Sequence, residues 1–310
     1  MEISLVIPVY NEEDLVEELI SRTREGLERF CRQFEIILVD DGSNDGTLNR
    51  LVKIQHGCTW LKVIALSRNF GHPAAFTAGL SRARGNYVAM MDGDLQDPPE
   101  LLESMYRDLK ADRFDVVSGK RIARMGNKTR NCFTALFHAL FKKVAGLDEL
   151  ENAGNFCMMN RQALKALLAM NERVRYLPGL RNFIGFRQGY VEYVRNDRLT
   201  GTPKMSTGRL LILAADAVFS FSRLPIRICL VIGLLGTLVF LLAGVYGLTA
   251  KLLGFAIPGW SSIVLSIYFL GSVQLIFLGV VGEYVYRIYK ESQRRPLFFI
   301  KKIYGEEADT

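Results

Sequence analysis

The chain has 310 residues, of which 49% are hydrophobic, and its 39 basic and 32 acidic residues give a formal charge of +7. This length allows one large domain with an appendage and leaves ample residues for a core. Its five cysteines form no C-x-x-C pair, which argues against a disulfide framework or a cysteine zinc site. The basic residues gather beside long apolar segments, so the charge favours membrane anchoring and no nucleic-acid partner.

Strand-like and helix-like segments alternate along the first 92 residues. Short apolar, β-branched runs predict strands, and the segments between them carry apolar residues at helical spacing. This alternation predicts an α/β fold with a mostly parallel sheet flanked by helices. The predicted strands begin at residues 3, 34, 61 and 85, and the predicted helices cover 11–30, 48–55 and 73–83.

Polar residues follow each predicted strand. Ligands of such sheets bind beyond the carboxyl ends of the strands, so these residues should converge on one edge. No G-x-G-x-x-G follows the first strand, and there is no G-x-x-x-x-G-K-[ST] phosphate loop, so bound phosphates would need another source of neutralisation. The residues are Pro8, Tyr10 and Glu12 after the first strand, Asp40 and Asp41 after the second, Arg68 and Asn69 after the third, and Asp92 and Asp94 after the fourth.

The segment MMDGDLQDPPE, residues 90–100, places three aspartates within six residues. Asp92, Asp94 and Gln96 share one side of an extended segment, and two carboxylates with an amide suit Mg²⁺ or Mn²⁺. A bound cation could neutralise a departing diphosphate. The alternative is a solvated loop, because an Asp-x-Asp pair also occurs by chance. The three histidines are isolated in sequence, and only His72 lies in a Gly/Pro loop near the predicted edge.

The C-terminal part contains two long apolar runs. Residues 228–250 have no charged side chain, and a second run, 252–282, is interrupted by GFAIPGW. Each run is long enough to cross a bilayer, so we expect a two-helix transmembrane hairpin over residues 228–286. Basic residues flank both outer ends, which predicts that the N-terminal α/β domain and both termini face the cytoplasm. The expected organisation is this α/β domain over 1–205, an interfacial amphipathic segment over 206–227, the hairpin, and a basic tail over 287–310.

Several segments together resemble glycosyltransferase family 2. They are LVIPVYNEE, ILVDDGSNDGT, LSRNFGHPAAFTAGLSRARGNYVAMMDGDLQDPPELL and EYVRNDRLTGTPKMS. The segments FSFSRLPIRI and FLGSVQLIFLGVVGEYVYRIYKESQRRP narrow the resemblance to polyprenyl-phosphate hexose transferases, the group of bactoprenol glucosyltransferases and, more distantly, dolichol-phosphate mannose synthases. The resemblance covers nearly the whole chain.

The resemblance implies a nucleotide-sugar-binding fold of the GT-A type and inverting transfer of a hexose, with UDP-glucose as the best guess, to undecaprenyl phosphate. It further implies a homo-oligomeric, multi-pass enzyme of the cytoplasmic membrane that serves envelope glycan modification. A basic loop, residues 118–134, is the candidate for the acceptor phosphate, and a solvated loop is the alternative there. The implied roles are nucleotide binding by Pro8, Tyr10, Glu12, Asp40, Asp41, Arg198 and Lys204, metal binding by Asp92, Asp94 and Gln96, catalysis by Asp92, Asp94 and Asn155, and lipid-phosphate binding by Arg121, Arg130 and Thr134.

One departure from the family pattern concerns AGNFCMMNR. Similar proteins carry Gly-Asp-Phe-Arg where this chain has Asn155 and Cys157 in place of the Asp and the Arg. An amide can keep sugar-facing hydrogen bonds, but it cannot act as a base. Two alternatives are open: transfer to a lipid alcohol such as diacylglycerol, against which the missing base argues, and a non-catalytic membrane scaffold with a degenerate nucleotide-sugar fold.

Overall fold

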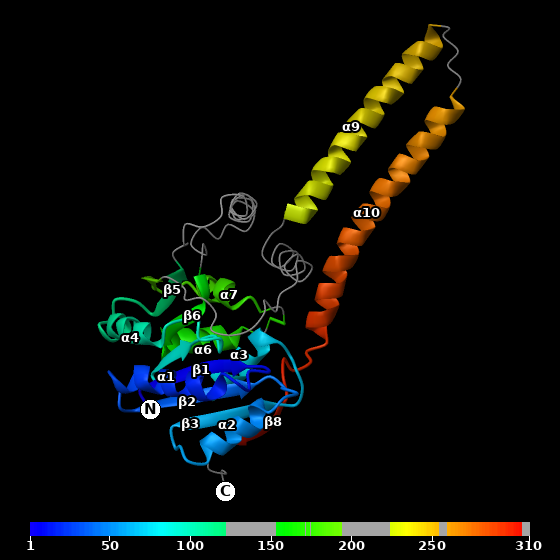
Figure 1. The fold of residues 1–310 in the computed structure, drawn as a ribbon. Helices are drawn as coiled ribbons and strands as arrows, with labels where there is room; N and C mark the ends of the chain where they lie inside the picture. Colours follow the sequence, from blue (N-terminus) through cyan, green and yellow to red (C-terminus); the bar gives the residue numbers. More distant parts are fainter. Residues whose placement is uncertain (122–152, 171, 174, 194–223, 254–258, 306–310) are drawn as a thin grey trace, which may run out of the picture. The chain divides into compact units, whose positions relative to one another are not determined.

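The structure, a computed structural model, describes residues 1–121, 153–170, 172–173, 175–193, 224–253 and 259–305 (Figure 1). The chain divides into two units. We call the first, Met1–Lys142 with Leu147–Lys204 and Arg295–Thr310, the sheet unit. The second, Lys143–Gly146 with Met205–Arg294, is the helical unit.

An eight-stranded sheet forms the centre of the sheet unit, in the order β7-β5-β6-β4-β1-β2-β3-β8. The first four strands are parallel, as predicted, whereas β6 and β8 run antiparallel to their neighbours, so the whole sheet is mixed. The strands are β1 Ile3–Val9, β2 Phe34–Asp40, β3 Leu61–Leu66, β4 Tyr87–Met90, β5 Val116–Arg121, β6 Ala153–Asn160, β7 Gln188–Tyr193 and β8 Ile300–Tyr304.

Helices cover both faces of the sheet, with α1, α2 and α4 on one face and α3, α6 and α7 on the other (Figure 1). Every residue of β1, β2 and β3 is buried, as expected for strands covered on both sides. α3 approaches closely because Gly79 has no side chain: a Cβ there would lie 2.3 Å from Val6 Cγ1. The helices are α1 Val16–Glu28, α2 Thr47–Gln55, α3 His72–Arg82, α4 Leu102–Lys110, preceded by the 3₁₀ turn η1 Pro99–Leu101, α6 Arg161–Ala169 and α7 Leu177–Phe183.

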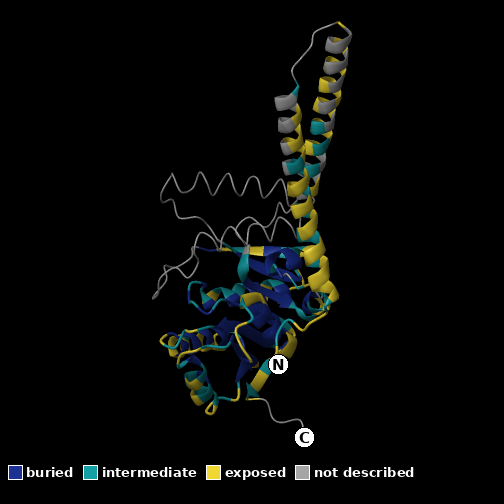
Figure 2. Cartoon of the chain, turned by 90° about the vertical axis from the view of Figure 1, so that its right-hand side faces the viewer, coloured by how far each residue is buried: buried dark blue, intermediate teal, exposed yellow. Residues whose placement is uncertain are grey.

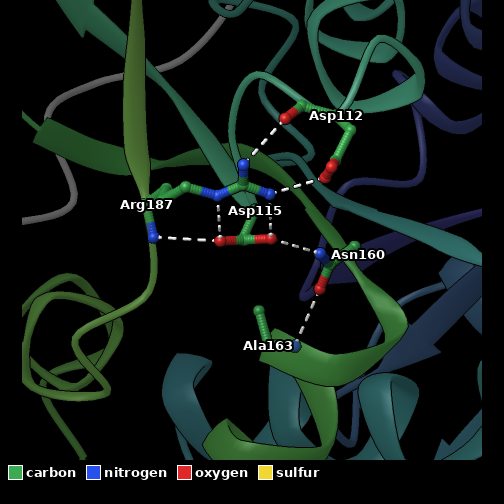
Figure 3. A network of polar contacts seen from close by, with 5 residues as sticks. All are labelled: Asp112, Asp115, Asn160, Ala163 and Arg187. Carbon is green, nitrogen blue, oxygen red and sulfur yellow. Dashed lines mark hydrogen bonds and ion pairs between the residues drawn. The ribbon is translucent and has the colours of Figure 1, made fainter.

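A polar network fastens β5, β6 and β7 at one end of the sheet (Figure 3). Asp115 accepts hydrogen bonds from Arg187 Nε at 2.9 Å and from Asn160 Nδ2 at 2.8 Å. Asn160 also caps α6, because its Oδ1 accepts from the backbone N–H of Ala163 at 2.9 Å. The Arg187 guanidinium holds the pKa of Asp115 below its ordinary value. Since Asn160 ends β6, the opposite end of that strand is left to carry Asn155.

The segment expected as a basic tail contributes a strand to the sheet. β8 pairs antiparallel with β3, and residues from Arg295 onward belong to the sheet unit. Its lysines, Lys301 and Lys302, are exposed on this edge strand. Exposed lysines hinder pairing with further strands, so they protect the edge.

The helical unit contains two long helices, α9 Leu224–Leu252 and α10 Trp260–Ser292, which run side by side (Figures 1 and 2). Among the described residues, Phe269–Ser292 is long and apolar enough to cross a membrane, and the apolar stretch Val231–Ala243 is shorter. Exposed residues lie along both helices (Figure 2), and many of them are large and apolar. Because water does not favour such surfaces, these helices need apolar surroundings.

Candidate functional site

The loops after β1 and β2 are joined by hydrogen bonds at the carboxyl edge of the sheet. The backbone N–H of Asn11 donates to Ser43 Oγ at 3.0 Å, and Asn11 Oδ1 accepts from the N–H of Asn44 at 2.9 Å. The N–H of Glu12 donates to Thr47 Oγ1 at 2.9 Å. These contacts use most of the polar groups of both loops and fix them as one surface.

Asp40 and Asp41, which end β2, are nearly fully buried and bind backbone groups. Asp41 accepts from the N–H groups of Phe70 at 2.8 Å and Gly71 at 2.9 Å, in the loop before α3. Asp40 accepts from the N–H of Ser43 at 3.3 Å. Burial raises the pKa of both carboxyl groups, and these hydrogen bonds oppose the rise. The two aspartates therefore hold the loops after β2 and β3 in place.

Gly42 allows the loops after β2 and β3 to touch. It has a φ of +71°, and a Cβ there would lie 2.5 Å from the carbonyl carbon of Arg68. A side chain would thus meet both an unfavourable backbone conformation and a backbone clash. The glycine is required by this close approach of the two loops.

The loop after β4 carries the predicted metal residues on one side. Asp92, Asp94 and Gln96 are half-buried, whereas the residues between them, Gly93 and Leu95, are buried. Leu95 has a φ of +56°, so the segment is a turn and not the extended segment that was predicted. The alternation in burial persists because the N–H of Gln96 donates back to Asp94 Oδ1 at 3.3 Å. The two carboxylates and the amide therefore share the more exposed side.

Asp92 receives contacts from two other elements. Asn155 Nδ2, at the start of β6, lies 3.4 Å from Asp92 Oδ1, and His72 Nε2, at the start of α3, lies 3.2 Å from the same oxygen. Strand order explains the contact with Asn155, because β4 pairs with β6. His72 reaches Asp92 because α3 packs over β1 and β2. The structure thus brings together the predicted Asp92 and Asn155 and adds His72, for which the Gly/Pro loop was the only sequence signal.

Asp97, the third aspartate of the segment, points away from the other two. It is fully buried, and its Oδ1 accepts a hydrogen bond from the hydroxyl of Tyr193 in β7. The Tyr193 ring packs edge-on against Phe156 in β6 at 5.8 Å. Asp97, which was not among the predicted metal residues, therefore anchors the loop to the neighbouring strands.

Arg181 in α7 was also not predicted as a site residue. Its side chain is buried, and it donates to the carbonyl oxygens of Gly154 and Asn155 and to Cys157 Sγ. Burial raises the pKa of the Cys157 thiol, so the sulfur beside the guanidinium stays protonated. The position where similar proteins carry an arginine is thus occupied by a neutral thiol that contacts an arginine from another element.

Comparison with known sequences decides the family. The profile described as "Glycosyl transferase family 2" matches residues 4–168, which contain β1 to β4, β6 and the loops described above. This chain belongs to glycosyl transferase family 2.

The sequence is similar to named members of that family over almost its full length. It is 38% identical to an uncharacterised glycosyltransferase of Synechocystis sp., covering 99% of this chain and 97% of that protein. It is 35% identical to the bactoprenol glucosyl transferase of Shigella phage SfV, covering 97% of this chain and 98% of that protein. It is 34% identical to a prophage bactoprenol glucosyl transferase homologue of Escherichia coli K12, over 98% of this chain and 99% of that one.

The family assignment confirms the predicted resemblance and the GT-A type of fold, a mixed sheet flanked by helices. Pro8 ends up inside β1, and Tyr10 and Glu12 are half-buried in the loop that follows. Some predicted residues lie outside the described part of the chain. These are Arg130, Thr134, Arg198 and Lys204, together with the side chain of Arg121.

The loop after β4 carries a set of side chains that fits a divalent cation. Within the described residues, no group of three or more His, Cys, Asp or Glu side chains is placed to hold a metal. Asp92 and Asp94 nevertheless supply two carboxylates from one loop, and Gln96 supplies an amide oxygen. Such hard oxygen donors suit Mg²⁺ or Mn²⁺, which commonly complete their coordination with substrate phosphates and water.

Proposed function

We propose that this chain transfers a hexose from a nucleotide sugar to a polyprenyl phosphate at a membrane surface. One observation carries the proposal. This glycosyl transferase family 2 chain combines converging loops after β1 to β4 with two long apolar helices. Full-length similarity to proteins named bactoprenol glucosyl transferase supports the same reading, since it includes those helices.

The donor would bind at the carboxyl edge of β1 to β4. Tyr10, Glu12 and Asp41 are proposed to contact the nucleoside, with Pro8 and Asp40 shaping the loops that hold it. UDP-glucose is the proposed donor, because the named relatives are glucosyl transferases. Arg198 and Lys204 are proposed to close over the diphosphate from outside the described residues, since cations there would neutralise its charge.

Asp92, Asp94 and Gln96 would hold Mg²⁺ or Mn²⁺ against the donor. A divalent cation bound there would supply Lewis-acid stabilisation of the negative charge that develops on the departing diphosphate. In this chain, Asn155 and His72 hold Asp92 from two sides, which orients its carboxylate toward the donor.

The acceptor determines whether the reaction needs a general base. A phosphate monoester has a second pKa of about 6, so its oxygen is already ionised at neutral pH. That oxygen would form a bond to the anomeric carbon from the face opposite the leaving group, while the bond to the nucleoside diphosphate breaks and its electron pair leaves with the diphosphate. The configuration inverts, and no proton needs to be removed. The protein must therefore position and neutralise charge, for which Arg121, Arg130 and Thr134 are the proposed acceptor residues.

The proposed location is the cytoplasmic membrane, with α9 and α10 both spanning it and the sheet unit and both termini in the cytoplasm. Basic residues in the last turns of α10 and just after it support this orientation. They are Arg287, Lys290, Arg294 and Arg295. Glycines with open space around them support close contact between copies, and hence a homo-oligomer. These glycines are Gly236, Gly271, Gly279 and Gly282.

The test is transfer of label from a panel of radiolabelled nucleotide sugars to undecaprenyl phosphate by the full chain in detergent with Mn²⁺ or Mg²⁺. Wild type is compared with Asp94→Ala and with a control, Asp108→Ala, whose side chain in α4 pairs with Arg113. An acid-labile glycolipid made by wild type and the control, but not by Asp94→Ala, would support the proposal and identify the donor.

Two other outcomes would contradict the proposal. Glycosylation of diacylglycerol with none of the phosphate would make the protein a lipid-alcohol transferase. Binding of a nucleotide sugar with no transfer to either lipid would favour a non-catalytic scaffold. The metal requirement is tested in the same assay, because EDTA should abolish transfer and added Mn²⁺ should restore it.

A further inference from the structure

Arg181 has an unusual environment for a charged side chain. Only 2% of it is exposed, and its described acceptors are all neutral groups of a single strand, β6. Nη1 lies 2.9 Å from the carbonyl oxygen of Asn155 and 2.7 Å from Cys157 Sγ, and Nη2 lies 2.6 Å from the carbonyl oxygen of Gly154. Removing a guanidinium from water costs several kcal/mol, so we expect this buried arginine to stabilise a particular part of the structure.

The part of the structure that Arg181 stabilises is an irregularity of β6. Ser118 of β5 pairs with Cys157, but the next register partner, Lys120, pairs with Ala153. Three residues of β6 therefore face one residue of β5. On the other side of β6, the pairing with β4 begins only at Cys157. The carbonyl groups of Gly154 and Asn155 thus lie outside both regular ladders, and an unsatisfied buried carbonyl costs about 1–3 kcal/mol.

The guanidinium of Arg181 satisfies both of these carbonyls at once. Its planar fork carries several donors in fixed directions, so a single side chain can hold two successive peptide groups and the Cys157 sulfur together. Gln188 Nε2 in turn donates to the carbonyl oxygen of Arg181 at 3.0 Å, which connects α7 to the start of β7. α7 is therefore fastened to the irregular part of β6.

The irregularity also determines where Asn155 points. A bulge turns a side chain away from the direction that regular pairing would give it. Here the Asn155 amide lies 3.4 Å from Asp92 Oδ1, the oxygen that His72 Nε2 also approaches at 3.2 Å. A continuous set of contacts thus runs from Arg181 through the backbone and side chain of Asn155 to Asp92.

We propose that Arg181 is a positioning residue of the transferase site, which fixes the β6 bulge and thereby directs the Asn155 amide onto Asp92. The inference rests on the proposed function, because it takes Asp92 and Asn155 as parts of the active site. It assigns to α7 control, through the backbone of β6, over the carboxylate that would face the donor.

The chain provides a matched control in Arg175. This arginine is also buried, at 7% exposure, and it also binds backbone carbonyls, those of Met170 at 2.7 Å and Leu167 at 3.1 Å. Both acceptors lie at the end of α6, not in β6. Substitution of Arg175 therefore measures how much altering a buried arginine lowers the transfer rate in general. Substitution of Arg181 measures that loss together with any effect through Asn155.

The experiment is a double-mutant cycle on the full chain in detergent. Transfer rates are measured for Arg181→Lys, Asn155→Ala and the double variant, and again with Arg175→Lys in place of Arg181→Lys. Lysine keeps the charge but cannot hold both carbonyls in one plane. We expect Arg181→Lys to lower kcat by about 10–100-fold, as is typical for groups that orient a site residue. The double variant should match Asn155→Ala within about twofold, whereas the effect of Arg175→Lys should be additive.

A second measurement covers the case in which Asn155→Ala leaves no rate to compare. Hydrogen exchange at residues 154–157 should become faster in Arg181→Lys and stay unchanged in Arg175→Lys. Additive rates in the Arg181 cycle, or unchanged exchange at these residues, would overturn the inference. The proposed function fails separately: wild-type transfer by both Asp94→Ala and Asn155→Ala would reject the site itself.

Discussion

Replacement of Asn155 by aspartate tests directly whether this side chain lies against Asp92. Because Asn155 Nδ2 is 3.4 Å from Asp92 Oδ1, the substitution would put a second carboxylate oxygen at about that distance. Two unit charges so close repel by roughly 1 kcal/mol at the dielectric constant of water and by roughly 5 kcal/mol at an effective value of about 20. The Asp92 side chain is 20% exposed, so we expect the loss in unfolding free energy to fall between these bounds.

The loss should depend on pH and on divalent cations. Repulsion raises the pKa of one carboxyl group in the folded state above its unfolded value of about 3.9. The penalty is therefore absent below about pH 4, grows as the pH rises toward the raised folded pKa, and is complete above it. A divalent cation should remove the penalty, since it turns repulsion into coordination. Pulse proteolysis in urea, on the full chain in detergent with EDTA or Mn²⁺, measures both effects.

Asn160→Asp is the matched control for this prediction. Asn160 Nδ2 donates to Asp115 Oδ1 at 2.8 Å, at the opposite end of β6, where the Arg187 guanidinium also binds that carboxylate (Figure 3). Asn160→Asp should lose less unfolding free energy than Asn155→Asp, because the Arg187 guanidinium offsets the added negative charge. Mn²⁺ should not change the loss for Asn160→Asp. If Asn155→Asp is as stable as wild type at about pH 8 in EDTA, or if both variants respond equally to Mn²⁺, the placement of Asn155 against Asp92 is refuted.

Two further predictions concern stability. Gly42→Ala and Gly185→Ala place a side chain at nearly the same φ, +71° and +70°, which should cost about 1–2 kcal/mol of unfolding free energy in each variant. Of these two glycines, Gly42 is crowded and Gly185 is not. Gly42→Ala should therefore lose about 1–3 kcal/mol more unfolding free energy, as measured by pulse proteolysis in urea. Equal losses would show that the loops after β2 and β3 do not touch. For Asp115, hydrogen bonds from Arg187 lower the folded pKa, so the stabilisation is present above the unfolded pKa of about 3.9 and is lost as the pH falls through the folded pKa. The difference in stability between wild type and Asp115→Asn should therefore shrink below about pH 4, and a difference that stays constant down to about pH 2 would contradict this.

The gathering of polar residues at the carboxyl edge of the sheet was predictable because it follows from a general rule. Parallel strands place their carboxyl ends together, so Asp40, Asp41 and Asp92 could be assigned to one region from strand order along the chain alone. The predicted metal set of Asp92, Asp94 and Gln96 left Asp97 out, and in the structure Asp97 is fully buried and bound to Tyr193. The partner itself could not be predicted, because Tyr193 lies 96 residues further along the chain.

The contacts of Asp92 could not be predicted because they depend on the order of strands in space. His72 and Asn155 are 83 residues apart in sequence. Asn155 meets Asp92 because β4 pairs with the antiparallel β6, and His72 meets it because α3 packs over β1 and β2. The register break opposite Ser118 has no clear sequence signature, since the segment AGNFCMMN contains neither a proline nor a turn motif. Arg181 was missed for the same reason: its role exists only because that break leaves two carbonyls for it to bind.

The charge around Asp92 bears on the choice between a phosphate and an alcohol acceptor. The described groups that approach its Oδ1 are an amide and an imidazole, and a fixed positive charge, Arg181, lies behind the strand that carries the amide. An alcohol acceptor must lose a proton, and a carboxylate at position 155 could serve as the base for that step, whereas an amide cannot. A phosphate that arrives ionised needs no base. The departure from the family pattern at this position therefore favours the phosphate acceptor over the lipid alcohol.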